Sequence, residues 1–282
     1  MTRSGKQVVF GLIFVIAVVL LVFGIYRWSE PVPTCFDKIQ NQQEEGVDCG
    51  KVCGNTCLQS LQPIRVLSSN LFKVSELNGQ IDYDALFRVY NPNTHFGSAN
   101  VEYSLRILNL NGDTISSILS KTGSLYILPG QTKYVYEPLL KAAKTSAGKD
   151  TVTLEITKID WQKLEGVFDE DIKLAIRSKD FFSDGKPGVL AGVTGTVFNS
   201  SDFDLNRVDV VVVLFKNNTP IAANRTDVRT LVAGSDRFFE VDWFSPISGT
   251  PDRVDAEANT NVFQDSNFIR RYGTQEKFQQ LY

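Results

Sequence analysis

Hydrophobic positions follow two contrasting patterns along this chain. Residues 8–26 read VVFGLIFVIAVVLLVFGIY, without one charged or amide side chain. From about residue 63, short runs of Val, Ile, Leu, Tyr and Phe alternate with polar residues, and clusters of Asn, Gly, Pro and Asp separate the runs. The first pattern predicts a helix that is apolar on every face, and the second predicts a region built from strands.

The apolar segment 8–26 has the length of a membrane span. At 1.5 Å per residue it forms a helix of roughly 28 Å, close to the ~30 Å hydrocarbon thickness of a bilayer. A buried core helix and a cleaved signal peptide are the alternatives. The run exceeds a usual signal-peptide core, and no small-x-small cleavage site follows it. We therefore expect an uncleaved signal anchor in contact with lipid.

The charges that flank this segment predict its orientation. Arg3 and Lys6 precede it, whereas Arg27 and Glu30 follow. Short N-terminal tails with basic residues tend to stay in the cytoplasm. The expected arrangement is a cytoplasmic tail at residues 1–7, a single pass through the plasma membrane at 8–26, and an extracytoplasmic remainder.

The strand-rich region repeats itself once. Asn91-Pro92-Asn93 and Asn199-Ser200-Ser201 each follow the end of a strand. Matching landmarks come in the same order roughly a hundred residues apart: strands from Val101 and Val208, from Leu128 and Leu231, and from Thr151 and Asp252.

This repeat predicts two β-sandwich domains in tandem, at residues 63–163 and 166–263. A single larger sandwich or barrel is the alternative. Residues 27–62 would form a spacer and a cysteine-rich neck, and residues 264–282 a C-terminal tail. A short helix is also expected at Leu139–Ala147, which reads LLKAAKTSA.

Both units resemble known families. Asn91-Pro92-Asn93 and Leu128-Pro129-Gly130 resemble the motifs of water-stress/late-embryogenesis-abundant (WHy) domains. Gly195–Asn199, Leu214-Phe215 and Gly234 resemble the FxLYD-type prokaryotic domain. The resemblance implies immunoglobulin-like sandwiches on an exported bacterial protein, with a scaffolding or binding role.

Composition and residue usage disfavour several functions. The net charge is −3 and no large basic block is present, so the sequence offers no basic surface that would attract nucleic-acid phosphates. His95, in a turn, is the only histidine, which disfavours a Ser–His–Asp triad and His-rich metal centres. The acidic run Asp169–Asp171 fits a solvated loop better than a glycosidase pair. We therefore expect no enzymatic activity.

All four cysteines lie in the predicted neck, at Cys35, Cys49, Cys53 and Cys57. Zinc sites usually have two close pairs, often CxxC, and this C-x13-C-x3-C-x3-C spacing fits them poorly. Two disulfides suit an exported module that is too small for a core of its own. A metal site and free or redox-active thiols are the alternatives, and three disulfide pairings stay open.

The neck also resembles a short cysteine motif of bacterial surface proteins, with lysines at positions 38 and 51 where that motif usually has glycine. The matching residues are Cys35, Asp37, Ile39, Asn41, Glu44, Gly46, Asp48, Cys49, Gly50 and Cys53. Asp37, Asn41, Glu44 and Asp48 could supply oxygen ligands to Ca²⁺. The alternative is a purely acidic surface, and no other cofactor is expected.

Together these features predict a membrane-anchored protein of the bacterial envelope with a structural or binding role. Its partners would be the lipid bilayer, through residues 8–26, and an envelope protein or glycan that the sequence does not identify. The alternative function is a subunit of a multi-protein membrane assembly, such as secretion, pilus or cell-wall machinery.

Overall fold

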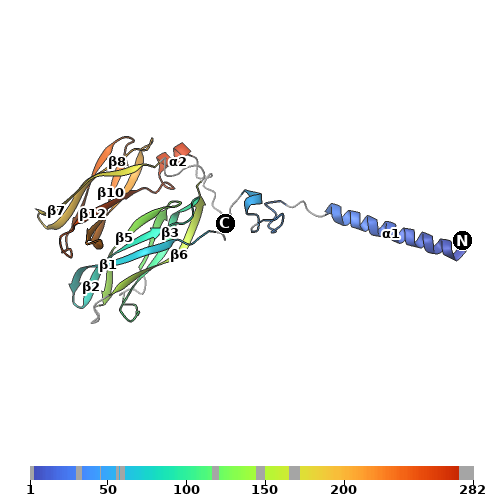
Figure 1. The fold of residues 1–282 in the computed structure, drawn as a ribbon, viewed down its shortest axis with the longest axis horizontal. Coiled ribbons are helices and arrows are strands. Elements are labelled where there is room, and N and C mark those ends of the chain that lie inside the picture. Colours follow the sequence, from blue (N-terminus) through green and yellow to red (C-terminus); the bar gives the residue numbers. More distant parts are fainter. Residues whose placement is uncertain are drawn as a thin grey trace. The chain divides into compact units, whose positions relative to one another are not determined.

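The computed structural model describes residues 3–29, 34–44, 46–54, 57, 61–115, 121–143, 150–164 and 172–272 (Figure 1). The chain divides into two compact units, Met1–Leu61 and Gln62–Tyr282. Each is described by itself.

The first unit contains one long helix and a small cysteine module. Helix α1 spans Arg3–Ser29 and includes the expected membrane segment, residues 8–26. Its side chains are described at residues 11–26, and all of them are exposed. Within the described residues, no helix has both the length and the apolar character needed to cross a membrane. Among its described residues, the module has one 3-10 turn, η1, at Lys51–Cys53.

The second unit is mainly β, as the alternating pattern predicts. Its first half consists of two antiparallel three-stranded sheets, ordered β1-β2-β5 and β4-β3-β6. The strands are β1 Arg65–Leu77, β2 Gln80–Tyr90, β3 Phe96–Leu108, β4 Lys121–Ile127, β5 Thr132–Ala143 and β6 Thr151–Lys163.

The second half has the same strand order, with sheets β7-β8-β11 and β10-β9-β12. Its elements are β7 Leu174–Lys186, β8 Val189–Asn199, β9 Leu205–Lys216, β10 Thr219–Leu231, β11 Asp236–Trp243, β12 Arg253–Asn259 and helix α2 Ser266–Tyr272. In each half, side chains from both sheets share one hydrophobic core.

Strand β9 joins the halves. Its residues 208–215 read VDVVVVLF and are almost continuously apolar, a pattern typical of a strand that is buried on both faces. Val210, Val212 and Leu214 face the core of the second half. Val211 and Val213 face the other way and pack with Tyr136 of the first half. The two halves are therefore held together by apolar contact.

A buried asparagine ends the second strand of each half. The Asn91 amide donates to the carbonyls of Phe96 at 2.6 Å and Leu128 at 2.9 Å. The Asn199 amide donates in the same way to the carbonyls of Phe203 at 2.9 Å and Leu231 at 3.1 Å.

The role of these asparagines does not depend on a left-handed backbone, because neither Asn91 nor Asn199 has a positive φ. Each is fully buried and uses its side chain to pair backbone groups that the strands leave unpaired.

The short helix expected at Leu139–Ala147 is wrong for its first five residues, which belong to β5. Leu140 and Ala142 are buried and pair with Tyr83 and Ile81 of β2, whereas Leu139 is exposed. Burial with a period of two, enforced by pairing to β2, overrides the helix propensity of this run. Residues 144–147 lie outside the described residues.

Helix α2 lies in the expected C-terminal tail, yet it contributes to the core. Phe268 is 1% exposed, and its ring meets that of Phe203 edge to face, with centroids 5.6 Å apart. The core of the second half therefore extends beyond residue 263, where the second domain was expected to end.

Candidate functional site

A polar cavity of about 440 Å³ lies where the two halves meet. Strands β4 and β5, which belong to different sheets of the first half, line one side of it, and β9 and β10 line the other. The charged lining residues are Lys133, Glu137, Arg207, Asp209, Arg225 and Asp227, and the aromatic ones are Tyr103, Tyr126, Tyr134 and Tyr136.

Lys133 of β5 is the most deeply buried cation of this cavity. Its side chain points to the same side of the strand as Val135 and Glu137 and is 6% exposed. Nζ donates to the Tyr126 carbonyl at 3.3 Å and lies 3.4 Å from the centroid of the Tyr126 ring. Burial lowers the pKa of Lys133 to about 8, because water no longer solvates the charge, and nearby Asp209 and Glu257 partly offset this effect.

A second charged group on the same face of β5 is Glu137. It accepts a hydrogen bond from the Tyr103 hydroxyl at 2.5 Å and forms an ion pair with Lys121 at 3.1 Å. Burial and the Glu137 carboxylate raise the pKa of Tyr103 well above its ordinary value. This phenol therefore stays neutral and acts as a hydrogen-bond donor.

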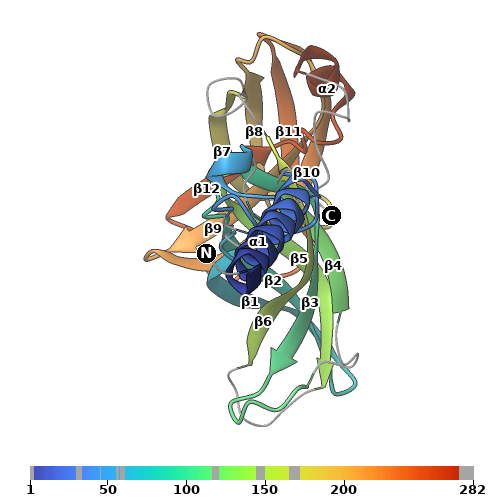
Figure 2. The ribbon, with the colours of Figure 1, turned by 90° about the vertical axis from the view of Figure 1, so that its right-hand side faces the viewer.

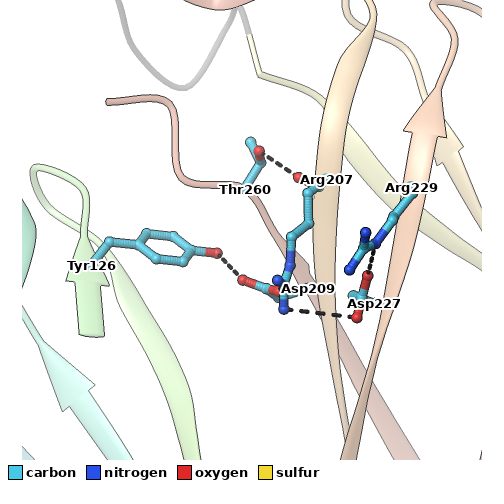
Figure 3. A network of polar contacts seen from close by, with 6 residues as sticks. All are labelled: Tyr126, Arg207, Asp209, Asp227, Arg229 and Thr260. Atoms are coloured by element: carbon cyan, nitrogen blue, oxygen red, sulfur yellow. Dashed lines mark hydrogen bonds and ion pairs between the residues drawn. The ribbon is translucent and has the colours of Figure 1, made fainter. Parts of the chain in front are cut away.

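On the opposite side of the cavity, Asp209 of β9 is bonded to both Tyr126 and Arg207 (Figure 3). Tyr126 reaches across from β4 and donates its hydroxyl to Asp209 Oδ2 at 3.2 Å. Arg207 Nε donates to Asp209 Oδ1 at 2.9 Å, and Arg207 Nη2 lies 3.7 Å from Asp227. Arg229 Nε donates to the other oxygen of Asp227 at 3.0 Å. This network connects the halves by polar contacts.

Hydrogen-bonding and charged groups gather in this cavity. The Tyr126 pKa is raised well above its ordinary value by burial and by Asp209, so this phenol is not a base at neutral pH. His95 is exposed in its turn, between β2 and β3, and is not among the lining residues. The arrangement can hold a polar ligand by hydrogen bonds and charge.

Sequence reasoning missed this cavity because its contacts join distant segments. Tyr126 and Asp209 are 83 positions apart in the chain, and Tyr103 and Glu137 are 34 apart. One local signal was available: in the run KYVYE at 133–137, a lysine and a glutamate occupy the core-facing positions on either side of Val135.

The cysteine module contains two disulfides, as the sequence predicts. Cys35 is bonded to Cys53 and Cys49 to Cys57. This resolves the three pairings that the spacing left open. Cys35, Cys53 and Glu44 place candidate ligand atoms within 4.8 Å of one another. Both sulfurs are in the disulfide, so they are not thiolate ligands.

Three of the four predicted calcium ligands, Asp37, Asp48 and Glu44, accept hydrogen bonds from backbone amides. Asp37 Oδ2 accepts from Thr34 N at 3.1 Å and from the Asn41 amide at 2.8 Å, and Oδ1 accepts from Ile39 N at 2.9 Å. Asp48 Oδ1 and Oδ2 both accept from Lys38 N, at 3.1 and 2.9 Å. The module thus brings Asp37, Asn41 and Asp48 to neighbouring turns.

Glu44, the third predicted carboxylate ligand, is 6% exposed. Its Oε2 accepts from Asn41 N at 3.3 Å and Asp48 N at 3.1 Å, and its Oε1 lies 3.1 Å from Cys53 Sγ. Asn41 Oδ1 is buried without a hydrogen-bond partner. The three carboxylates stabilise tight turns through these hydrogen bonds, and calcium binding at these residues stays a prediction.

Comparison with protein-family models and with curated proteins found no match. Among solved structures, the chain is similar to red sea bream transglutaminase, with 11% identity over 74% of this chain and a TM-score of 0.20. It is also similar to β-glucuronidase 2 of Bacteroides uniformis, with 9% identity over 70% of this chain and a TM-score of 0.21. The chain spans 30% of each of these two proteins.

Proposed function

We propose that this chain is a single-pass membrane protein whose extracytoplasmic part is a structural or binding module of a bacterial envelope. Residues 1–7 are the cytoplasmic tail, 8–26 the anchor, and the β-rich unit consists of two immunoglobulin-like sandwiches in tandem. The cavity between its halves is where the module binds its ligand.

One observation carries the anchor: apolar side chains are exposed around the whole circumference of α1. Val18, Val19, Leu20, Leu21 and Val22 are consecutive and each is 44–64% exposed. Five residues cover more than one helical turn, so no face of the helix is polar. Such a surface is unfavourable in water and favourable in hydrocarbon.

The disulfides support the extracytoplasmic placement of the rest of the chain. Cys35–Cys53 and Cys49–Cys57 link all four cysteines within a short module. Disulfides persist in oxidising compartments and are rare in the reducing cytoplasm.

The shared strand order of the two halves supports the tandem sandwiches. Residues 62–282 also form one compact unit with a polar cavity, as expected of a rigid binding module on an anchor.

Membrane extraction combined with protease treatment tests this proposal. The full chain, expressed in a bacterium, should stay in the membrane pellet after alkaline carbonate and be digested by protease added outside the inner membrane. Leu20→Lys with Leu21→Lys should release it from the pellet, because each charge costs about 3 kcal/mol at a helix centre. Leu20→Ile with Leu21→Ile is the matched control. Release of the unaltered chain by carbonate would contradict the proposal.

A further inference from the structure

We propose that the cavity between the halves binds a carboxylate-bearing molecule of about monosaccharide size, held by Lys133 at its base and Arg225 at its mouth. This inference rests on the binding role proposed above, and it is independent of the membrane anchor.

The acceptors of the cavity are already engaged. Both Glu137 oxygens have partners, one the Tyr103 hydroxyl and the other Lys121. Both Asp209 oxygens accept hydrogen bonds, from Tyr126 and Arg207. A ligand with cationic groups would therefore meet carboxylates whose charge is already partly compensated by internal partners.

The remaining carboxylate is engaged as well, and so are the hydroxyls of three of the four lining tyrosines. The two Asp227 oxygens face Arg229 and Arg207. The hydroxyl of Tyr136 donates to Asp84 at 2.6 Å, as those of Tyr103 and Tyr126 donate to their own carboxylates. Because these protons already point at carboxylates, the hydroxyls have no donor left for a ligand.

Two cations of the cavity form no ion pair with a described residue, although Asp209 and Glu257 lie near Lys133. Lys133 donates only to the Tyr126 carbonyl and contacts its ring, which leaves two of its three protons unused. The Arg225 guanidinium donates no hydrogen bond to any described residue, although its charge acts on Tyr103 and Tyr136. These two cations are the charged groups of the cavity without an ion pair in the described part of the chain, and their complement is an anion with several acceptor oxygens.

Burial and size narrow the ligand further. Lys133 is buried while Arg225 is exposed, so the two cations mark the depth of the cavity from base to mouth. The volume of about 440 Å³ lies within the range of small-molecule sites, and aromatic residues line it. A ring-sized molecule with a carboxylate matches the two cations by its charge, the cavity volume by its size and the aromatic lining by its ring.

The charge state of Lys133 makes the binding sensitive to pH. The charged groups near its ammonium are Asp209 on β9 and Glu257 on β12, and Tyr126 on β4 covers it. Only the protonated amine attracts an anion. Because the Lys133 pKa is about 8, affinity should decrease as the pH rises through this value.

Calorimetric titration of the full chain in detergent tests the inference. Galacturonate and citrate separate a sugar acid from a non-sugar carboxylate, and glucose is the uncharged comparison. We expect a carboxylate to bind at least roughly tenfold more tightly than glucose at pH 7, and more weakly at pH 9.

Two arginines on β10 provide a matched pair of variants. Arg225→Gln removes a guanidinium without a partner and should weaken carboxylate binding roughly tenfold. Arg229→Gln removes an exposed guanidinium that already pairs with Asp227 and does not line the cavity, so binding should change little.

Three outcomes would overturn the inference: equal binding of glucose and the carboxylates, no binding of either carboxylate at millimolar concentration, or equal effects of the two variants. A chain that stays in the carbonate pellet but shows one of these outcomes contradicts the inference and leaves the anchor intact.

Discussion

At the scale of single residues, the structure assigns side chains to roles that their type alone does not reveal. Asn91 and Asn199 were recognisable from the sequence as landmarks of a repeat. Both are fully buried and donate to distant carbonyls. Asn91 donates to Leu128, 37 residues away, and Asn199 to Leu231, 32 residues away. Such bonds connect a strand end to a distant turn, so turn propensity could not predict them.

Replacing Asn91 or Asn199 should destabilise the protein. Asn91→Ala leaves the carbonyls of Phe96 and Leu128 without their side-chain donor, and we expect a loss of about 2–4 kcal/mol from the free energy of unfolding. The control is Asn100→Ala. The Asn100 amide forms one long, exposed side-chain hydrogen bond, to Glu102 at 3.5 Å, so its loss should cost little. Urea denaturation measures both, and similar small losses would contradict this role.

Lys133 should make stability rise with pH. Its folded pKa of about 8 lies below the ordinary value of 10.5, so between these values the unfolded chain binds more protons. The free energy of unfolding should therefore increase from pH 8 towards pH 10, by on the order of 1–3 kcal/mol. Higher pH is avoided because Tyr103 and Tyr126, whose folded pKa values are raised, then oppose the effect.

Urea denaturation at pH 7.5 and pH 10 checks this, with Lys133→Met as the comparison. The variant should lose the increase, since no amine titrates at that position. An equal increase in both proteins would assign the pH dependence to other groups.

At the scale of elements, local pattern and tertiary pairing sometimes disagree. The alternation of β strands was readable from the sequence, and so was the unusual character of β9, with its run of apolar residues. The run at Leu139–Ala143 has helix-forming residues, but pairing with β2 makes it a strand. In the cysteine module, spacing indicated disulfides, and only the folded turns selected Cys35–Cys53 and Cys49–Cys57.

Calcium should not stabilise the cysteine module. The oxygens of Asp37 and Asp48 already accept backbone amides, which compete with a cation for the carboxylate charge. We expect no shift in melting temperature and no change in tryptophan fluorescence when millimolar Ca²⁺ is added to the full chain. A shift that is abolished by Asp48→Asn would instead show that the predicted site binds calcium.

At the scale of the whole molecule, the β-rich unit depends on the contact between its halves. Val213 is fully buried, in a cluster with Leu86 and Tyr136 of the first half. The polar bonds from Tyr126 to Asp209 and from Gln131 to Asn259 lie at the same junction. Apolar contact stabilises the junction, and the polar bonds define its geometry.

A charge at this junction should separate the unfolding of the halves. Val213→Lys places an unpaired ammonium in an apolar contact, whereas the cores of both halves keep their own residues. The unaltered β-rich unit should unfold in one calorimetric transition, and the variant in two. Val213→Ile, which stays apolar, is the control. Two transitions in the unaltered protein would show that the halves are not coupled.

The sequence by itself determined the apolar helix, the disulfide-bonded state of the cysteines, the β character of the larger unit and its internal repeat. These follow from periodicity and spacing, which are local. The tertiary structure decided the disulfide pairing, the backbone bonds of Asp37 and Asp48, the burial of Phe268 and the cavity around Lys133. Each of these depends on which distant segments meet. That outcome is set by packing and desolvation across the whole fold, and no short stretch of residues encodes it.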